Sequence, residues 1–171
     1  MALFLEENQI VGGFPPVDMQ TTANNGDYVN LSNYQKVTVL FWSVIGTAGD
    51  DPTVTFQQAS DVAGTGVKAL NPDSAKAFKK QAATNLLSTG AWADASADIS
   101  TNTWTNADSA EQETLVAIDI DADELDVDNS FNCIRATVAD VGSNAQLGAL
   151  VYILSKPRFP AAAANMLSAI A

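Results

Sequence analysis

Histidine is absent from the chain, and cysteine occurs once, at Cys133. The absence of histidine removes the commonest general base and the commonest metal ligand of proteins. A single cysteine cannot form a disulfide within the chain, and cysteine–histidine catalysis is excluded. Because Cys133 lies between Asn132 and Ile134 in a predicted strand, we expect it to be a small core residue.

Charge is also scarce, at 16% of the residues, and positive charge is the scarcer sign, with 8 Lys and Arg against 20 Asp and Glu. The net charge of -12 opposes nucleic-acid binding, which needs clustered cations against the phosphates. The one short basic cluster, Lys76, Lys79 and Lys80, is typical of a solvated face. We therefore expect no nucleic-acid partner.

Long hydrophobic runs are missing as well, since no apolar stretch reaches the roughly 18 to 20 residues that a membrane helix needs. The first residues, MALFLEENQIVGG, have neither a basic segment nor a long apolar run, so they do not read as a signal peptide. These features predict synthesis in a cytoplasm and no membrane partner.

Hydrophobic residues nevertheless make up 47% of the 171 residues, enough for one domain with a substantial core. The segments 36–45 and 146–154 are rich in β-branched and aromatic residues and are apolar on both faces. Such runs predict strands covered on both sides, and we interpret this double burial as packing inside the protein rather than as an interface. Segment 53–58 alternates cleanly, with Val54 and Phe56 facing inward, as in a sandwich.

The remaining pattern also favours strands. Segments 114–120 and 131–139 alternate, and 140–145 is predicted to be a hairpin loop. Segment 74–87 fits either a short helix by propensity or a strand with Lys76, Phe78 and Lys80 on one face, and we favour the strand because its surroundings are strands. Trp92 and Trp104 are expected to anchor the packing. About seven or eight strands with no long helix predict an all-β fold, an antiparallel β-sandwich or a jelly-roll-like barrel.

The two ends are predicted to lie outside this sandwich. We expect an extended N-terminal arm over residues 1–16, a β-sandwich domain over 17–158, and a C-terminal tail or short helix over 159–171. Glycines and prolines at 12, 13, 15 and 16 should break any regular element in the arm. Each end can dock on its own domain or on a neighbouring subunit, and both alternatives stay open. The apolar residues proposed to contact partners are Leu3, Phe4, Leu5, Ile10, Phe14, Phe159, Met166, Leu167 and Ile170.

Eight carboxylates lie between Glu111 and Asp128. The stretch from Asp119 to Asp123 is similar to the start of a calcium loop, but Glu124 stands where glycine is needed and Ser130 where a bidentate glutamate is expected. A calcium site of another kind stays open, whereas the favoured interpretation is a row of acids on the solvent side of a β-edge. No metal site is predicted.

Catalytic motifs are not found in the sequence. Asp50 and Asp51 precede Pro52 in a turn, where aspartate is favoured for its backbone hydrogen bonds rather than for acid–base work. The glycines at 64 and 66 match neither a P-loop nor a dinucleotide fingerprint, and no Gly-x-Ser-x-Gly elbow occurs. We therefore expect no enzyme and no cofactor, with an acid-pair hydrolase as the least favoured alternative.

The segment NYQKVTVLFWSVIGTAGDDPTVTFQQASDVAGTGVKALN resembles small virion structural proteins of tailed bacteriophages. The resemblance rests on an alternating strand, GTAGDDP, T-x-T-x-Q-Q-A and D-V-x-G-T-G-x-K-A-L, and continues in FLEENQIVGGFPPVDMQT and FNCIRATVADVGSNAQLGALVYIL. It does not extend over residues 73–110, and it brings no catalytic residues with it.

This resemblance implies a non-enzymatic virion component, made in the host bacterial cytoplasm, of the head-decoration, head-fibre or another accessory type. Its implied partners are major capsid or accessory subunits and further copies of itself. The alternative is a carbohydrate- or receptor-binding β-module on the virion surface, with Trp92, Trp104 and region 84–110 as its contact surface.

Overall fold

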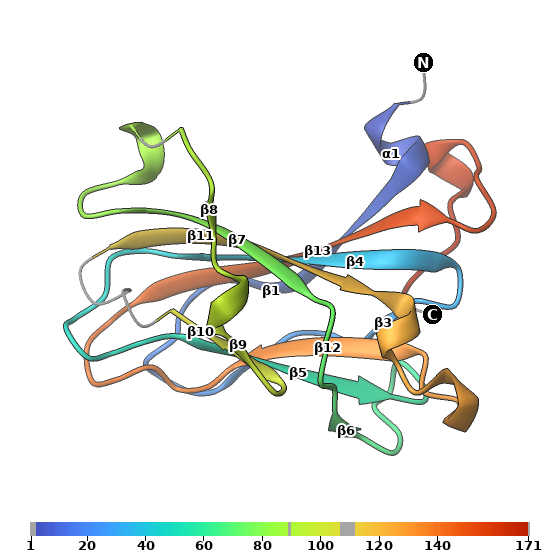
Figure 1. The fold of residues 1–171 in the computed structure, drawn as a ribbon, viewed down its shortest axis with the longest axis horizontal. Coiled ribbons are helices and arrows are strands. Elements are labelled where there is room, and N and C mark those ends of the chain that lie inside the picture. Colours follow the sequence, from blue (N-terminus) through green and yellow to red (C-terminus); the bar gives the residue numbers. More distant parts are fainter. Residues whose placement is uncertain (1–2, 89, 107–111, 171) are drawn as a thin grey trace.

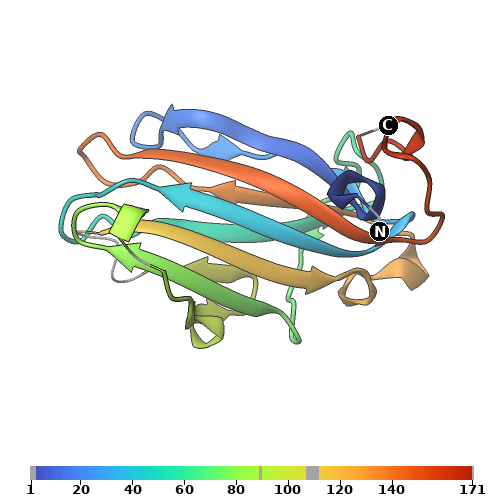
Figure 2. The ribbon, with the colours of Figure 1, turned by 90° about the horizontal axis from the view of Figure 1, so that it is seen from above.

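The computed structural model describes residues 3–88, 90–106 and 112–170, and it shows two antiparallel β-sheets packed face to face (Figure 1). The predicted all-β sandwich is confirmed. The six-stranded sheet has the order β1 (Asn8–Asp18), β13 (Leu147–Pro157), β4 (Tyr34–Ser43), β11 (Glu113–Asp121), β7 (Lys76–Ala82) and β8 (Ala93–Asp94). Figure 2 shows this sheet from above, with β1 near one edge and β7 near the other.

The second, seven-stranded sheet is built from shorter strands. Its main path is β2 (Asn24–Asn25), β12 (Cys133–Val138), β5 (Thr53–Ala59), β10 (Thr103–Thr105) and β9 (Ile99–Ser100). Off this path, β3 (Val29–Asn30) pairs with β12 and β6 (Lys68–Ala69) pairs with β5. The helices described are α1 (Phe4–Glu7) and single 3-10 turns at Leu86–Ser88, Ser96–Asp98, Ala122–Glu124, Val127–Asn129 and Ala163–Asn165.

The core lies between the inner faces of the two sheets. Phe41 and Tyr152 from the six-stranded sheet and Phe56, Trp104 and Ile134 from the other are fully buried. Strand alternation explains this, since every second residue of each long strand points inward. The alternation also confirms the strand favoured within 74–87, because β7 turns Phe78 outward and Ala77 into the core.

Chain connections differ from the prediction at residues 140–145. The segment links β12 of one sheet to β13 of the other, so the predicted hairpin is wrong. Residues 46–52 make the corresponding crossing from β4 to β5, and the two crossings touch: the backbone N–H of Ser143 donates to Asp50 Oδ2 at 3.4 Å. Both sheets are therefore tied together at this end of the sandwich.

The N-terminal segment is more regular than expected. From Asn8 onward it forms edge strand β1, which pairs with β13 from Asn8 opposite Ser155 to Asp18 opposite Leu147. Its glycines and prolines do not end the strand, because they fall where the pairing register shifts, between Gly12 and Phe14 and between Phe14 and Val17. The arm predicted over residues 1–16 is thus a strand from residue 8.

Of the two forms expected for the C-terminus, a tail or a short helix, the structure has a tail with one 3-10 turn, and hydrogen bonds fix it to the sandwich. The backbone N–H of Arg158 donates to Asn33 O at 2.8 Å, and that of Asn30 donates to Ala169 O at 2.8 Å. The Tyr34 hydroxyl donates to Leu167 O at 2.9 Å. The tail therefore folds back on its own domain.

Candidate interaction surface

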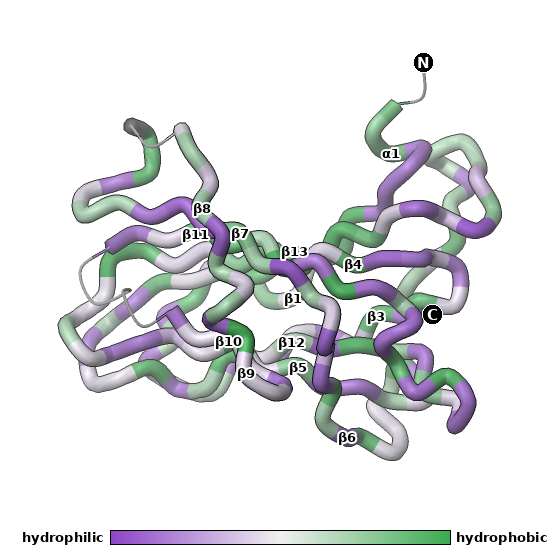
Figure 3. Tube along the Cα trace, in the orientation of Figure 1, coloured by the Kyte–Doolittle hydropathy of each residue, from purple (hydrophilic) through white to green (hydrophobic). Residues whose placement is uncertain are grey.

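The start of β1 and the end of β13 are neighbours, since the two strands are antiparallel with Asn8 opposite Ser155. Helix α1 and the tail therefore lie at the same end of the sandwich, as Figure 2 shows. Inside α1, the backbone N–H of Leu3 donates to Glu6 Oε2 at 2.8 Å, and Asn8 Nδ2 donates to Phe4 O at 2.9 Å. These bonds hold a short helix above the sheet, apolar in its first half and acidic in its second (Figure 3).

Apolar side chains on this end are exposed on both termini. Of the nine predicted partner contacts, seven are exposed, namely Leu3, Phe4, Leu5, Ile10, Phe159, Leu167 and Ile170. Met166 is half-buried and packs against the core. Phe14 is a correction: it points inward from β1 and is buried in the main core, so it is not available to a partner. We call the seven exposed residues and the clefts between them the terminal surface.

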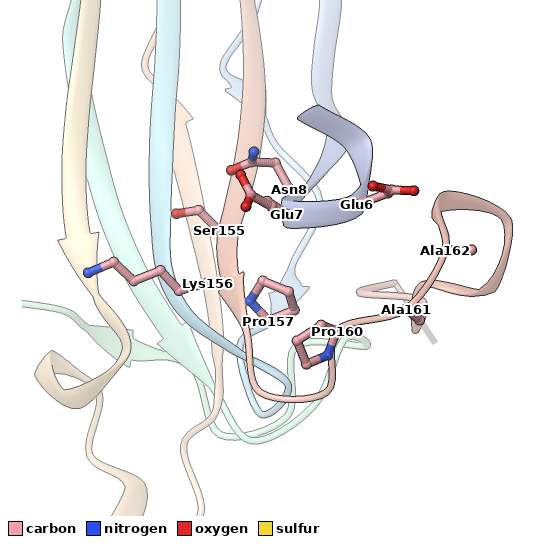
Figure 4. A pocket seen from close by; sticks show the side chains of 9 residues that line it. All are labelled: Glu6, Glu7, Asn8, Ser155, Lys156, Pro157, Pro160, Ala161 and Ala162. Carbon is pink, nitrogen blue, oxygen red and sulfur yellow. The ribbon is translucent and has the colours of Figure 1, made fainter. Parts of the chain in front are cut away.

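Two adjoining clefts shape the terminal surface. The larger, of about 850 Å³, lies between α1 and segment 155–162, and Figure 4 shows its lining side chains. Glu6 and Glu7 come from α1, Lys156 and Pro157 from the end of β13, and Pro160 from the start of the tail. The smaller cleft, of about 340 Å³, has an apolar lining that includes Leu5, Ile10 and Met166. An apolar floor beside charged groups suits a protein segment better than a small polar ligand.

A second exposed apolar area lies on the outer face of the six-stranded sheet. Trp42 of β4 is 50% exposed and Leu147 of β13 is 50% exposed, whereas their neighbours Phe41 and Leu150 are fully buried. The predicted burial of β4 and β13 on both faces is therefore wrong, because no third layer of the described chain covers the centre of the outer side. The apolar pattern on both faces was the correct signal, and its interpretation as internal packing was the error.

The carboxylates of the acidic segment have partners within the chain. Asp119 accepts hydrogen bonds from Lys36 Nζ at 3.3 Å and Thr38 Oγ1 at 2.5 Å. Burial lowers the pKa of Lys36, but Asp119 and Asp121 outweigh this and raise it. Strand β11, which carries both aspartates, is interior to its sheet, so their expected position at a β-edge is wrong.

Glu124 and Asp126 of the acidic segment also have hydrogen-bond partners within the chain. Glu124 accepts from the backbone N–H groups of Asp73 and Ser74 at 3.1 and 2.9 Å. Hydrogen bonds from Lys68 and Asn129 lower the pKa of Asp126. Within residues 3–88, 90–106 and 112–170, no three His, Cys, Asp or Glu side chains gather as a metal site; Glu111 lies outside these residues. Four of these acids, Asp119, Asp121, Glu124 and Asp126, thus serve hydrogen bonds and ion pairs of the fold.

The two tryptophans of the carbohydrate-binding alternative behave differently. Trp104 is fully buried between the sheets, as a packing anchor should be. Trp92 is 46% exposed, and Lys80 Nζ lies 5.0 Å from its ring centroid. Part of region 84–110, residues 89 and 107–110, lies outside the described chain. A contact surface that uses both tryptophans is therefore incompatible with the fold.

Comparisons with known proteins leave the family open. No family model matches the chain, and no curated protein matches it. The SPBc2 prophage-derived protein YomS is similar over 88% of this chain and 94% of its own, at 13% identity and a TM-score of 0.43. A structure of infectious bursal disease virus, Gt strain, is similar over 94% of this chain and 44% of its own, at 12% identity and a TM-score of 0.26. These scores are too low to carry an argument about function.

None of the helices in the described ranges is long and apolar enough to cross a membrane.

Proposed function

We propose that the protein is a non-enzymatic virion structural protein that binds capsid or accessory subunits through the terminal surface. The observation that carries this proposal is the meeting of exposed apolar side chains from both termini at one end of the sandwich. The resemblance of segment 33–71 to phage virion proteins supports the virion as its location. Within this role, the protein decorates the head or forms part of a head fibre.

The energetics favour a protein partner at this surface. Phe4 and Phe159, at 55% and 67% exposed, leave large apolar areas in water. Full burial of a side chain of this size is worth about 1.5 to 3 kcal/mol, so several together can hold an assembled particle. Glu6 and Glu7 at the cleft add a negative rim, which steers docking toward a partner with a positive or neutral surface.

Serine substitutions on the terminal surface test this proposal. We expect Phe4→Ser combined with Phe159→Ser to lower the fraction of protein that co-sediments with particles assembled without it. Leu87→Ser is the matched control, because Leu87 is an apolar residue, 95% exposed, in the turn Leu86–Ser88 before β8, at the opposite end of the strands from α1 (Figure 1). Binding of the double variant at the level of the control would contradict the proposal, provided that circular dichroism shows both to be folded.

A further inference from the structure

The outer face of the six-stranded sheet carries a continuous apolar centre. Strand register places one row of four residues across β13, β4, β11 and β7, namely Val151, Leu40, Ala117 and Phe78. The next row on the same face begins with Ala149, Trp42 and Leu115 and ends at Lys80. Residues directly opposite each other on neighbouring strands are about 5 Å apart, so these side chains form one surface.

Edges of this sheet are poorly suited to pairing with another chain. Strand β1, at one edge, has two register shifts and carries Pro15 and Pro16, which lack a backbone N–H. Strand β8, at the other edge, has two residues. Association through the sheet is therefore expected at its outer face rather than by addition of strands.

Charge on the outer face is nearly balanced. Strands β4, β7, β8, β11 and β13 place on it three lysines, Lys36, Lys76 and Lys80. They also place on it four carboxylates, Asp94, Glu113, Asp119 and Asp121. The sum is 3 − 4 = −1, against −12 for the whole chain. Two copies of this acidic protein repel each other through most of their surface, but the repulsion between two outer faces is small.

The size of the face also matches what a dimer needs. Five long strands spaced by about 4.8 Å are about 24 Å wide, and ten residues at about 3.3 Å extend about 33 Å, which gives roughly 800 Å². One side of a standard stable interface buries about the same area. Its centre of Leu, Val, Ala, Phe and Trp has few hydrogen-bonding groups, which disfavours a sugar and favours another apolar face.

We propose that the outer face of the six-stranded sheet binds the same face of a second copy of this chain, in a two-fold symmetric dimer. Helix α1 and the segment before β8 rise above this face at opposite ends of its strands (Figure 1). A partner sheet about 24 Å wide fits between ends about 33 Å apart when the strands of the two copies cross, which is the orthogonal form of sheet packing. The two faces then overlap over about 24 Å by 24 Å, roughly 580 Å² of each copy, which is the size of a weak and reversible interface. The dimer is independent of the virion role proposed above.

Sedimentation velocity on the purified chain tests the dimer. We expect the wild type to shift from monomer to dimer between about 1 and 200 μM, and Trp42→Ser and Phe78→Ser each to raise the dissociation constant at least about tenfold. Trp42→Phe, which keeps an apolar ring but loses the bond from Trp42 Nε1 to Glu113 Oε1 at 2.8 Å, should stay near wild type. Val127→Ser should dimerise normally.

Cysteine cross-linking locates the interface with the native cysteine left in place, because Cys133 is fully buried. Leu40→Cys, Ala117→Cys and Val151→Cys sample the centre of the face, where a two-fold axis brings a residue close to its own copy. We expect oxidation to give a covalent dimer for at least one of the three and for none at Val127→Cys.

Three results would overturn the dimer. The first is a wild type that is monomeric over the whole concentration range. The second is an unchanged dissociation constant in both Trp42→Ser and Phe78→Ser, with melting curves showing both folded. The third is saturable binding of a glycan in an array screen that Trp42→Ser abolishes in a monomeric protein, which would assign the face to carbohydrate. Particle binding by Phe4→Ser has no bearing on these measurements, so the two proposals fail separately.

Discussion

Tyr152 on the six-stranded sheet is hydrogen-bonded to Ala136 on the seven-stranded sheet. The backbone N–H of Ala136 donates to the Tyr152 hydroxyl at 2.8 Å, and the hydroxyl donates to Ala136 O at 3.4 Å. Both residues are fully buried. Gly26 completes the contact, since a Cβ there would lie 2.4 Å from the hydroxyl oxygen and 2.6 Å from Ala136 O. The two layers are thus linked by a polar contact within the core.

Removal of this hydroxyl should destabilise the fold. We expect Tyr152→Phe to lower the free energy of unfolding by about 1 to 3 kcal/mol, because the Ala136 N–H is left buried without a partner. Urea denaturation monitored by tryptophan fluorescence measures the change. The matched control is Tyr28→Phe, since the buried Tyr28 hydroxyl has no hydrogen-bond partner among the described residues. Equal losses in the two variants would contradict the role given to Tyr152.

Gly142 should be intolerant of any side chain. Its φ is +58°, and a Cβ there would lie 1.9 Å from Asp50 Cγ, so the Asp50 carboxylate would have to move away and lose its hydrogen bond from the Ser143 N–H. We expect Gly142→Ala to destabilise by more than the roughly 1 kcal/mol that a left-handed conformation alone costs. Gly49→Ala measures the cost of the left-handed backbone alone, because Gly49 has φ +88° and no atom within 4 Å of the added Cβ. Gly12→Ala is the control without either effect, since Gly12 has neither a left-handed φ nor a neighbour within 4 Å. Thermal melts that rank the three in another order would refute this explanation.

Tyr34 should control the mobility of the tail. Its hydroxyl lies 2.5 Å from Gln9 Oε1 and 2.9 Å from Leu167 O, so it joins β1 to the tail. We expect Tyr34→Phe to speed amide exchange at Asn30, whose N–H donates to Ala169 O, while exchange in the centre of β4 stays slow. Exchange followed by NMR or mass spectrometry gives both rates in one sample. Protection at Asn30 equal to wild type would show that the tail is held by its apolar packing instead.

Cys133 should be inert in the folded protein. Burial, with a smaller contribution from the Asp61 carboxylate, raises the pKa of its thiol from 9.0 to about 11. The unfolded thiol ionises from about pH 9 while the folded one stays neutral, so the stability that this group contributes is present below pH 9 and is lost between pH 9 and about 11. We expect wild type to lose stability relative to Cys133→Ala over that window. A thiol reagent that reacts equally fast with folded and denatured protein at pH 8 would contradict the burial.

The sequence indicated the strands well where alternation and turn residues agreed. Val54 and Phe56 on β5, and Lys76, Phe78 and Lys80 on β7, lie on the faces predicted for them. It indicated β1 poorly, because glycine and proline are ordinarily strand breakers and a single sequence does not show that an edge strand with bulges can absorb them. The short helix that was one alternative for the tail is absent for a related reason. Alanine favours a helix, but contacts to Asn30, Asn33 and Tyr34 hold the C-terminal segment in an irregular path.

The residues of the candidate surfaces also divide into those that the sequence indicated and those that only the structure identified. Leu3, Phe4 and Leu5 could be proposed as exposed from the sequence, because they precede the strands and have no periodic partner. Phe14 could not be separated from them, since its inward direction is set by the pairing of β1 with β13. The outer face was missed altogether, although Trp42 and Val151 stood in the pattern, because a strand that is apolar on both sides is the same in sequence whether its second side meets its own chain or another.

By itself, the sequence determined that this is an all-β, acidic protein without histidine chemistry, since composition and strand periodicity are properties of the chain alone. The tertiary structure decided which apolar residues remain in contact with water. That choice depends on the number of layers. The seven-stranded sheet covers the inner side of β4 and β13, and no third layer of the described chain covers their outer side. Exposure is a property of three-dimensional packing between segments far apart in sequence, and hydrophobicity at single positions does not encode it.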